Sequence, residues 1–294
     1  MKKKRLVCVL AGLLVAVVAA VAFWFIVGFK NDATIEIAED APEVENSDIE
    51  IVEPVVPDPL ETVLRSEKYF IERRLTRYLN YIELHPELTM TQIVKEINCD
   101  FDKTRYQDVT NADLSYGELS LVSKYYYLDH YEPDDLIELG RYSSGRATKM
   151  QKTAGEAFIR MADAAANDGL IIKNISGYRS YDYQNTLYNN YAARDGYAGA
   201  DTYSSRPGYS EHQTGLATDI NSVDSSFENT AEFRWLQQHA VEYGFILRYP
   251  KGLEDITGFI YEPWHYRYVG VEAAEQIVHE GLTFEEYYAY YIER

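Results

Sequence analysis

Two short segments of this 294-residue chain place histidines and carboxylates at close spacing. His212 and Asp219 lie seven residues apart, and Glu262 lies three residues before His265. A hydrolytic zinc site takes three protein ligands from histidine and carboxylate and leaves a further position for water. It also needs a carboxylate that is not a ligand, which takes a proton from that water. The candidate ligands are therefore His212, Asp219 and His265, and the candidate base is Glu262.

Each pair taken alone is a weak signal, because such spacings also arise by chance and His265 could be a core histidine. A helix would separate His212 from Asp219 by about 10 Å, too far for a shared ion. Gly215 between them instead favours a loop that turns into a strand carrying Asp219. Pro263 holds Glu262 extended, so the second pair is expected on a strand or bend. Both pairs together are a much stronger signal than either alone.

Three segments carry a specific resemblance to a known family. They read Ser-Gly-Tyr-Arg-Ser at 176–180, Ser-Glu-His-Gln-Thr-Gly-Leu-Ala-Thr-Asp at 210–219 and Glu-Pro-Trp-His-Tyr-Arg-Tyr at 262–268. These segments resemble the VanY-type D-alanyl-D-alanine carboxypeptidases of the LAS, or M15, zinc peptidases, over roughly residues 150–280. The resemblance implies one zinc ion bound by His212, Asp219 and His265, with Glu262 as the catalytic base.

The resemblance also implies three substrate-binding residues. Arg179 would hold the terminal carboxylate of the substrate, since a guanidinium binds a carboxylate through two parallel hydrogen bonds. Gln184 and Ser210 resemble substrate contacts of the same family. A structural role for Arg179, paired with Asp182, is the alternative. Two further residues, Arg206 and Tyr209, are weaker candidates for the cleft.

The function implied is that of a zinc carboxypeptidase that removes the terminal D-alanine from peptidoglycan stem peptides. An L,D-carboxypeptidase acting on the tetrapeptide stem is the nearest alternative, and an endopeptidase is less favoured because Arg179 suits a free C-terminus. A non-catalytic module that binds cell-wall peptides is an alternative of a different class. That module would tolerate loss of Glu262, which is present.

The elements that must position these residues read as an α+β fold. Short strands are expected at 170–175, 216–221, 245–249 and 259–268, and helices at 153–167, 180–195, 229–243, 271–279 and 284–292. Capping boxes are expected at Thr153 with Glu156, at Asn229 with Glu232 and at Thr283 with Glu286. The predicted sheet is small and mostly antiparallel, flanked by helices, and the resemblance implies a Hedgehog/DD-peptidase-like fold.

The domain prediction places a helical and loop subdomain at 61–148 before the catalytic domain at 149–294. In the subdomain, helices are expected before Pro86 and at 91–97, and no chemistry is assigned to it.

The N-terminal region predicts a membrane location. Residues 1–30 contain a basic tip followed by 23 uncharged residues, Leu6 to Gly28, enough to span a bilayer. The positive-inside rule places the remainder of the chain outside the cell. A cleaved signal peptide is the alternative, but the apolar run continues past the small residues at 20–22. Residues 31–60 are acidic and proline-containing, typical of a linker.

The composition limits the partners and the chemistry. The formal net charge of −19 argues against nucleic acid as a partner. Cys8 and Cys99 are the two cysteines, one in the apolar run and one far from the candidate ligands, so no disulfide framework and no cysteine-ligated zinc is expected.

Overall fold

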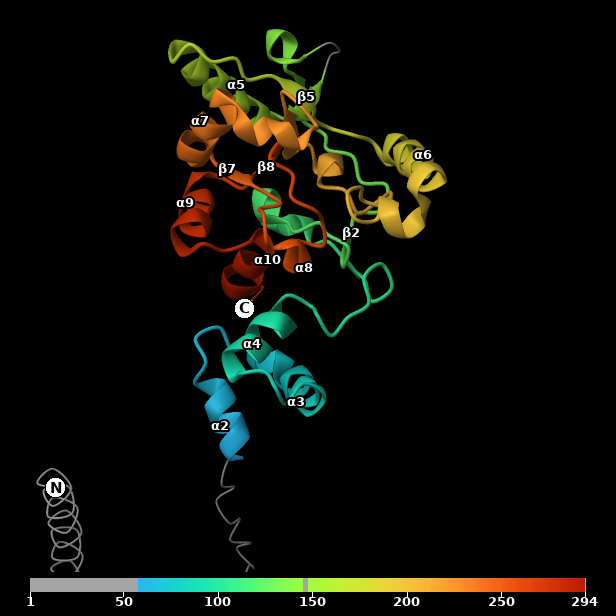
Figure 1. Ribbon diagram of the computed structural model, residues 1–294, viewed down its shortest axis with the longest axis vertical. Coiled ribbons are helices and arrows are strands. Elements are labelled where there is room, and N and C mark those ends of the chain that lie inside the picture. The colour runs from blue at the N-terminus through green and yellow to red at the C-terminus, as the bar shows by residue number, and fades with distance from the viewer. Residues whose placement is uncertain (1–57, 145–147, 294) are drawn as a thin grey trace, which may run out of the picture. The chain divides into compact units, whose positions relative to one another are not determined.

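A computed structural model describes residues 58–144 and 148–293 (Figure 1). Their central feature is a sheet of β5 (Asn174–Ser176), β6 (Ala217–Ile220), β7 (Phe245–Leu247) and β8 (His265–Tyr268). The strands lie in the order β5-β6-β8-β7, and each neighbouring pair is antiparallel. The predicted α+β class with a small antiparallel sheet is therefore confirmed.

The pleat of β6 and β8 separates their side chains onto two faces. Ile220 of β6 and Tyr266 and Tyr268 of β8 belong to the main hydrophobic core. Asp219 and His265 alternate with these residues and so point to the opposite face. The face that does not fill the main core thus receives the ionisable side chains Asp219, His265 and Arg267.

Helices cover both faces of the sheet. In the main core, α5 (Lys152–Asn167) and α7 (Ala231–His239) pack against Phe245 of β7. A second cluster contains Ile246 of β7, packed with α9 (Val271–Glu280), α10 (Phe284–Tyr287) and the π-helical turn η7 (Tyr288–Ile292). Successive residues of β7 therefore join two different cores, as its alternation requires.

Residues 58–98 form a helical cluster of their own. It comprises α2 (Pro59–Arg65), the 3-10 turn η1 (Glu72–Arg74), α3 (Leu75–Leu84) and α4 (Met90–Asn98). Both predicted helices of this region are confirmed by α3 and α4. The cluster contacts the C-terminal turn, since Tyr69 stacks on Tyr290 with ring centroids 3.7 Å apart and Arg74 pairs with Glu293.

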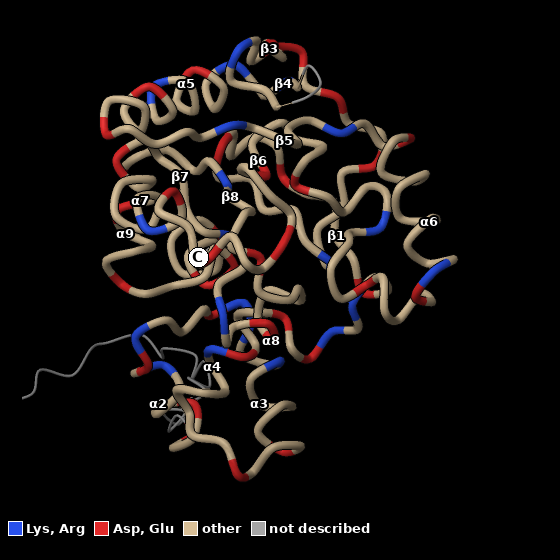
Figure 2. Tube along the Cα trace, turned by 45° about the horizontal axis from the view of Figure 1, so that its top comes forward, with Lys and Arg blue, Asp and Glu red and all other residues tan. Residues whose placement is uncertain are grey.

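The segment that follows is mostly irregular. It contains β1 (Thr110–Asn111), which pairs in parallel with β2 (Tyr126–Tyr127), and the 3-10 turns η2 (Leu114–Leu119) and η3 (Gly140–Tyr142). Next, β3 (Leu136–Glu138) pairs antiparallel with β4 (Lys149–Gln151) and lies beside α5 (Figure 2). Gly155 of α5 permits this approach, because a Cβ there would lie 2.8 Å from Ile137 Cδ1. The β3–β4 pair crosses the predicted boundary between residues 148 and 149.

The remaining elements connect the strands of the sheet. They are α6 (Tyr181–Ala200), the 3-10 turns η4 (Glu211–Thr214), η5 (Ser225–Asn229) and η6 (Ala240–Tyr243), and the short α8 (Glu254–Thr257). Ser180 caps α6, and the predicted end at Gly196 is a break with φ 75°, after which one further turn continues to Ala200.

Two predicted capping boxes are wrong and one is confirmed. The N-cap of α5 is Gln151, because the helix begins directly where β4 ends. The N-cap of α7 is Thr230, whose side chain accepts a hydrogen bond from the Phe233 amide. The box of Thr283 with Glu286 is present at the start of α10.

Two predicted strands are shorter than expected. Only the last part of 170–175 joins the sheet, and 259–268 is a strand only from His265 onward. The amide of Ile260 donates to Thr202 and that of Glu262 to Tyr249, so these groups bond to loops instead of a strand. This irregular stretch places Glu262 three residues before β8 begins.

No helix in the described ranges is long and apolar enough to span a bilayer. The predicted anchor at Leu6–Gly28 and most of the predicted linker lie outside those ranges. Figure 2 shows basic and acidic residues interspersed over the described part of the chain, with no concentration of basic residues on one element.

Candidate active site

Asp219 and His265 are brought together by strand register. They are direct partners across the β6–β8 pair, and Asp219 Oδ1 lies 3.3 Å from His265 Nδ1. Cross-strand partners on one face have Cβ atoms about 5 Å apart, which suits a shared ion. Both side chains are buried. The predicted strand for Asp219 and strand-or-bend for His265 are confirmed.

His212 reaches the same point from η4, which ends at Gly215 in the left-handed conformation with φ 72°. Its Nδ1 lies 2.7 Å from the Gly177 carbonyl oxygen, so Nδ1–H donates and the lone pair is on Nε2. That Nε2 faces Asp219 Oδ2 at 3.5 Å. Burial and the nearby Arg179 guanidinium lower the pKa of His212 to about 4, which favours the neutral imidazole that a metal requires.

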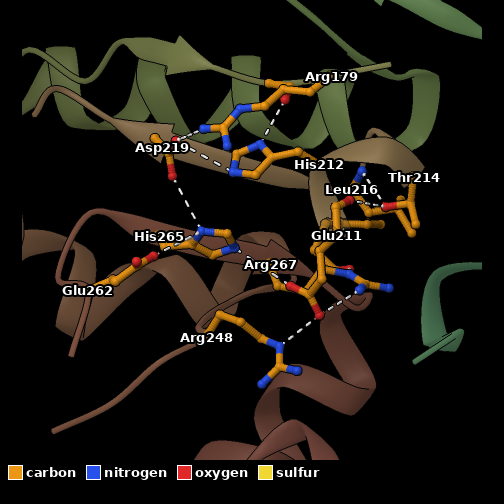
Figure 3. A network of polar contacts seen from close by, with 12 residues as sticks. Arg179, Glu211, His212, Thr214, Leu216, Asp219, Arg248, Glu262, His265 and Arg267 are labelled. Atoms are coloured by element: carbon orange, nitrogen blue, oxygen red, sulfur yellow. Dashed lines mark hydrogen bonds and ion pairs between the residues drawn. The ribbon is translucent and has the colours of Figure 1, made fainter. Parts of the chain in front are cut away.

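These three side chains fit a zinc ion. Each offers one ligand atom, and the three atoms lie within 4.8 Å of one another (Figure 3). Asp219 Oδ1 is buried without a hydrogen-bond partner among the described residues, which a cation would supply. A set of two histidines and one carboxylate is typical of catalytic zinc. The predicted ligands therefore converge, and Figure 3 shows them in one group between β6, β8 and η4.

Glu262 lies beside this group. Its Oε2 is 3.4 Å from His265 Nδ1, and the His265 amide donates to its backbone carbonyl. Burial raises the pKa of Glu262 above its usual value. A carboxyl group next to the ligands, with an affinity for protons higher than usual, matches the predicted base.

Arg179 also points at the ligand group. Its Nε donates to Ser176 Oγ at 2.8 Å, and one terminal nitrogen donates to Asp219 Oδ2 at 2.6 Å. Among the described residues Arg179 does not pair with Asp182, the alternative partner, because its guanidinium binds Asp219 instead. Although burial opposes it, His212 and Arg179 hold the pKa of Asp219 well below its usual value.

A cleft of about 440 Å³ opens above these residues. Gln184 and Ser210, the other predicted contacts, both line it and are buried. Arg206 and Tyr209 do not line it: Arg206 pairs with Asp201, and Tyr209 packs against Tyr106 and Tyr127. The cleft is lined by Arg179, Gln184, Leu187, Tyr191, Arg194, Tyr203, Ser204, Ser205, Ser210, Glu211, His212, Asp219, Val223, Tyr249, Phe259, Ile260, Glu262, Trp264 and His265.

Sequence reasoning missed a buried ion cluster below the site. Glu211 Oε1 accepts from Arg248 at 2.7 Å and from Arg267 at 3.0 Å, and Arg248 also binds Glu285 of α10 through two nitrogens. Although burial opposes it, the two guanidinium groups hold the pKa of Glu211 well below its usual value. Arg267 within the buried strand β8 was the available signal, since a fully buried arginine requires partners.

Comparison with known proteins agrees with this geometry. A family profile described as VanY, D-alanyl-D-alanine carboxypeptidase, matches residues 147–271. The putative carboxypeptidase YodJ of Bacillus subtilis (strain 168) is 44% identical over 181 residues, which is 58% of this chain and 66% of YodJ. The matched segments span about half to two thirds of the length of the curated relatives.

Two solved structures are similar over most of their own length. The structure of the LdcB LD-carboxypeptidase has a TM-score of 0.59 and 40% identity, covering 63% of this chain and 91% of LdcB. The second structure is a mutant of the vancomycin-resistance D,D-pentapeptidase VanY from a VanB-type cassette, in complex with Zn(II). It has a TM-score of 0.50 and 36% identity, and the match covers 58% of this chain and 98% of that VanY chain. The motifs meet at one cleft, the family profile matches the segment that contains them, and both solved structures are similar in sequence and fold. This chain therefore belongs to the VanY family of D-alanyl-D-alanine carboxypeptidases.

Proposed function

We propose that this protein is a zinc-dependent D,D-carboxypeptidase that removes the C-terminal D-alanine from peptidoglycan stem peptides. The observation that carries the proposal is the convergence of His212, Asp219 and His265 with Glu262 and Arg179 at one cleft. Family membership supports the reaction class, and the Zn(II) complex of the similar VanY supports the metal.

Each residue has a separate task in this proposal. Bound zinc would supply an acidified water and a polarised carbonyl. Glu262 takes a proton from the attacking water and delivers it to the amine of the departing D-alanine. His212, Asp219 and His265 hold the metal.

The cleft offers groups that suit a peptide with a free C-terminus. Arg179 donates to the ligand Asp219, and a guanidinium pairs well with a carboxylate. Gln184 Nε2 donates to the Ser205 carbonyl at 2.7 Å, while its Oε1 is buried without a partner among the described residues. That oxygen is placed to accept a hydrogen bond from a substrate amide. Ser210 adds a hydroxyl on the same wall.

An L,D-carboxypeptidase is the second candidate. The similarity to the LdcB LD-carboxypeptidase favours it, and Arg179 serves a free carboxylate in either substrate. A binding module without catalysis ranks last, because it would not require Glu262 at the cleft.

The test is to incubate the zinc-loaded full chain, in detergent, with two peptides separately. One is a stem pentapeptide ending in D-Ala-D-Ala, and the other is the tetrapeptide ending in a single D-Ala. Loss of one alanine from the pentapeptide, read by mass and abolished by a chelator, is the expected result. Loss only from the tetrapeptide would establish the second candidate, and cleavage of neither by zinc-bound protein would overturn both.

We also propose that the catalytic part lies outside the cell, anchored by a single membrane helix at residues 6–28 and held away by the linker. The uncharged run and its basic flank support this placement. Membrane fractionation with protease treatment of intact cells tests it: the protein should sediment with membranes and be digested from outside. Release into the medium as a shortened chain would instead support a cleaved signal peptide.

A further inference from the structure

Two buried atoms below the candidate zinc site lack hydrogen-bond partners and face each other. They are Glu211 Oε2 and His265 Nε2, 3.6 Å apart. Both residues are buried, and no other described group bonds either atom. Leaving a buried polar atom unsatisfied is unfavourable, so a hydrogen bond between these two is favoured over leaving both unpaired.

The direction of that bond fixes the tautomer of His265. An ionised carboxylate only accepts, so the proton must be on Nε2. Nδ1, which faces Asp219 Oδ1 at 3.3 Å and Glu262 Oε2 at 3.4 Å, is then the nitrogen left to bind a metal. A carboxylate bonded to the outer nitrogen of a histidine ligand orients the ring and makes it a better ligand.

The buried ion cluster holds Glu211 in this orientation. Its other oxygen, Oε1, accepts from both Arg248 and Arg267, so the carboxylate cannot rotate freely. Arg267 is held in turn by the carbonyls of Glu118 and Ser120, outside the sheet. Figure 3 shows Glu211 between His265 on one side and the two arginines on the other.

We propose that Glu211 is a positioning residue that fixes the ring and the tautomer of His265 for metal binding, an inference that rests on the proposed zinc function. Glu211 is separate from the general base: Glu262 lies at the Nδ1 side of His265, and Glu211 lies at the Nε2 side. The cluster therefore links the metal ligand to α10 through Arg248 and Glu285.

The test compares Glu211→Gln with Glu285→Gln in the full chain. Both substitutions remove one negative charge from the same buried cluster, but only Glu211 faces His265. In Glu211→Gln, Arg248 and Arg267 should continue to donate to the side-chain oxygen at this position. The NH₂ group of the new amide then faces His265. That group donates, and it therefore forces the His265 proton onto Nδ1. We expect Glu211→Gln to weaken zinc binding about 10- to 100-fold, measured by chelator competition.

The control and a second readout separate positioning from folding. Glu285→Gln should lower the urea midpoint but leave zinc affinity close to that of the wild type. In the zinc-loaded protein, the nitrogen chemical shifts of His265 should report an Nε2–H that donates to a carboxylate in the wild type, and this signal should be absent in Glu211→Gln. Equal zinc affinity in both variants, or an equal loss in both, would overturn the proposal. Because neither readout uses a peptide, wild-type protein that binds zinc but cleaves no peptide would overturn the proposed function alone.

Discussion

Three buried carboxylates surround His265, and their different neighbours give them different properties. Asp219 binds the Arg179 guanidinium, and Glu211 binds two arginines, so the pKa of each is held low. Glu262 has a raised pKa because burial dominates there. A ligand must remain ionised, whereas a base must gain and release a proton, and these environments match those two requirements.

This difference predicts a separation of metal binding from turnover. Glu262→Ala should retain zinc but lower kcat about 10²- to 10⁴-fold, because the water loses its proton acceptor. His212→Ala should lose both, because one of three ligands is gone. Zinc content after dialysis measures metal binding, and the rate of peptide hydrolysis measures turnover. Equal zinc loss in both variants would contradict the assignment of Glu262 as a base that is not a ligand.

Arg179 predicts a preference for a free C-terminus. Arg179→Ala should lower kcat/KM for a peptide acid about 10- to 100-fold, the effect of losing one hydrogen bond between charged groups. The same substitution should change little for the C-terminal amide of that peptide, which has no carboxylate to bind. Parallel assays of the acid and the amide measure this. Equal losses on both peptides would indicate that Arg179 acts only through its bond to Asp219.

At the scale of elements, strands and loops rather than helices present the metal ligands and the base, and Asp219 and His265 lie on β6 and β8. His212 lies in a short 3-10 turn, Glu262 lies before β8 in irregular backbone, and Arg179 precedes α6. Such backbone is held by specific contacts. Gly208, in the loop before η4, has φ 85° and packs directly on the Tyr127 ring.

Gly208 and Gly252 therefore form a matched pair for substitution by alanine. Both have positive φ, near 85°, so both alanines incur a backbone cost of about 1–2 kcal/mol. At Gly208 a Cβ would also lie 2.1 Å from Tyr127 Cε2, whereas at Gly252 nothing lies within 4 Å. Gly208→Ala should thus destabilise the protein by about 1–3 kcal/mol more than Gly252→Ala. Urea unfolding of both variants measures the difference, and equal midpoints would contradict the close contact.

At the scale of the whole described chain, residues before the family motifs help to build the cleft. The Gln213 amide next to His212 donates to the carbonyls of Asp129 and Tyr131. Buried Lys124 donates to the carbonyls of Asp201 and Gly258, each at 2.5 Å, and so ties together two loops that lead into the cleft wall. The segment predicted to carry no chemistry therefore supports the part that does.

Lys124 predicts a dependence of stability on pH. Burial, with Arg105 and Arg206 nearby and Asp201 opposing them, lowers its pKa from 10.5 to about 8. Between these values the unfolded chain holds a proton that the folded chain has released, so raising the pH favours folding. The stability of the wild type relative to Lys124→Met should rise by up to about 3 kcal/mol between pH 8 and pH 10.5.

Urea unfolding of both proteins at about pH 7 and about pH 10 measures this change. Groups that titrate in both proteins, including the tyrosines, cancel in the comparison. A difference between wild type and Lys124→Met that stays constant with pH would contradict the lowered pKa.

The amino-acid sequence alone was enough to predict the chemistry of the candidate site. Residue types and spacing identified His212, Asp219, His265 and Glu262, because metal ligation and proton transfer need those side chains whatever the fold. Periodicity and glycines also predicted most helices and the α+β class, since these signals are local.

The tertiary structure decided which groups hold those residues in place. Glu211 with Arg248 and Arg267, Lys124 with two distant carbonyls, and the pairing of Arg179 with Asp219 all join positions far apart in the chain. Local spacing contains no information on such pairs, because they depend on strand register and on which loops meet. The same reason explains why residues before 149, which have no motif of their own, become part of the support of the cleft.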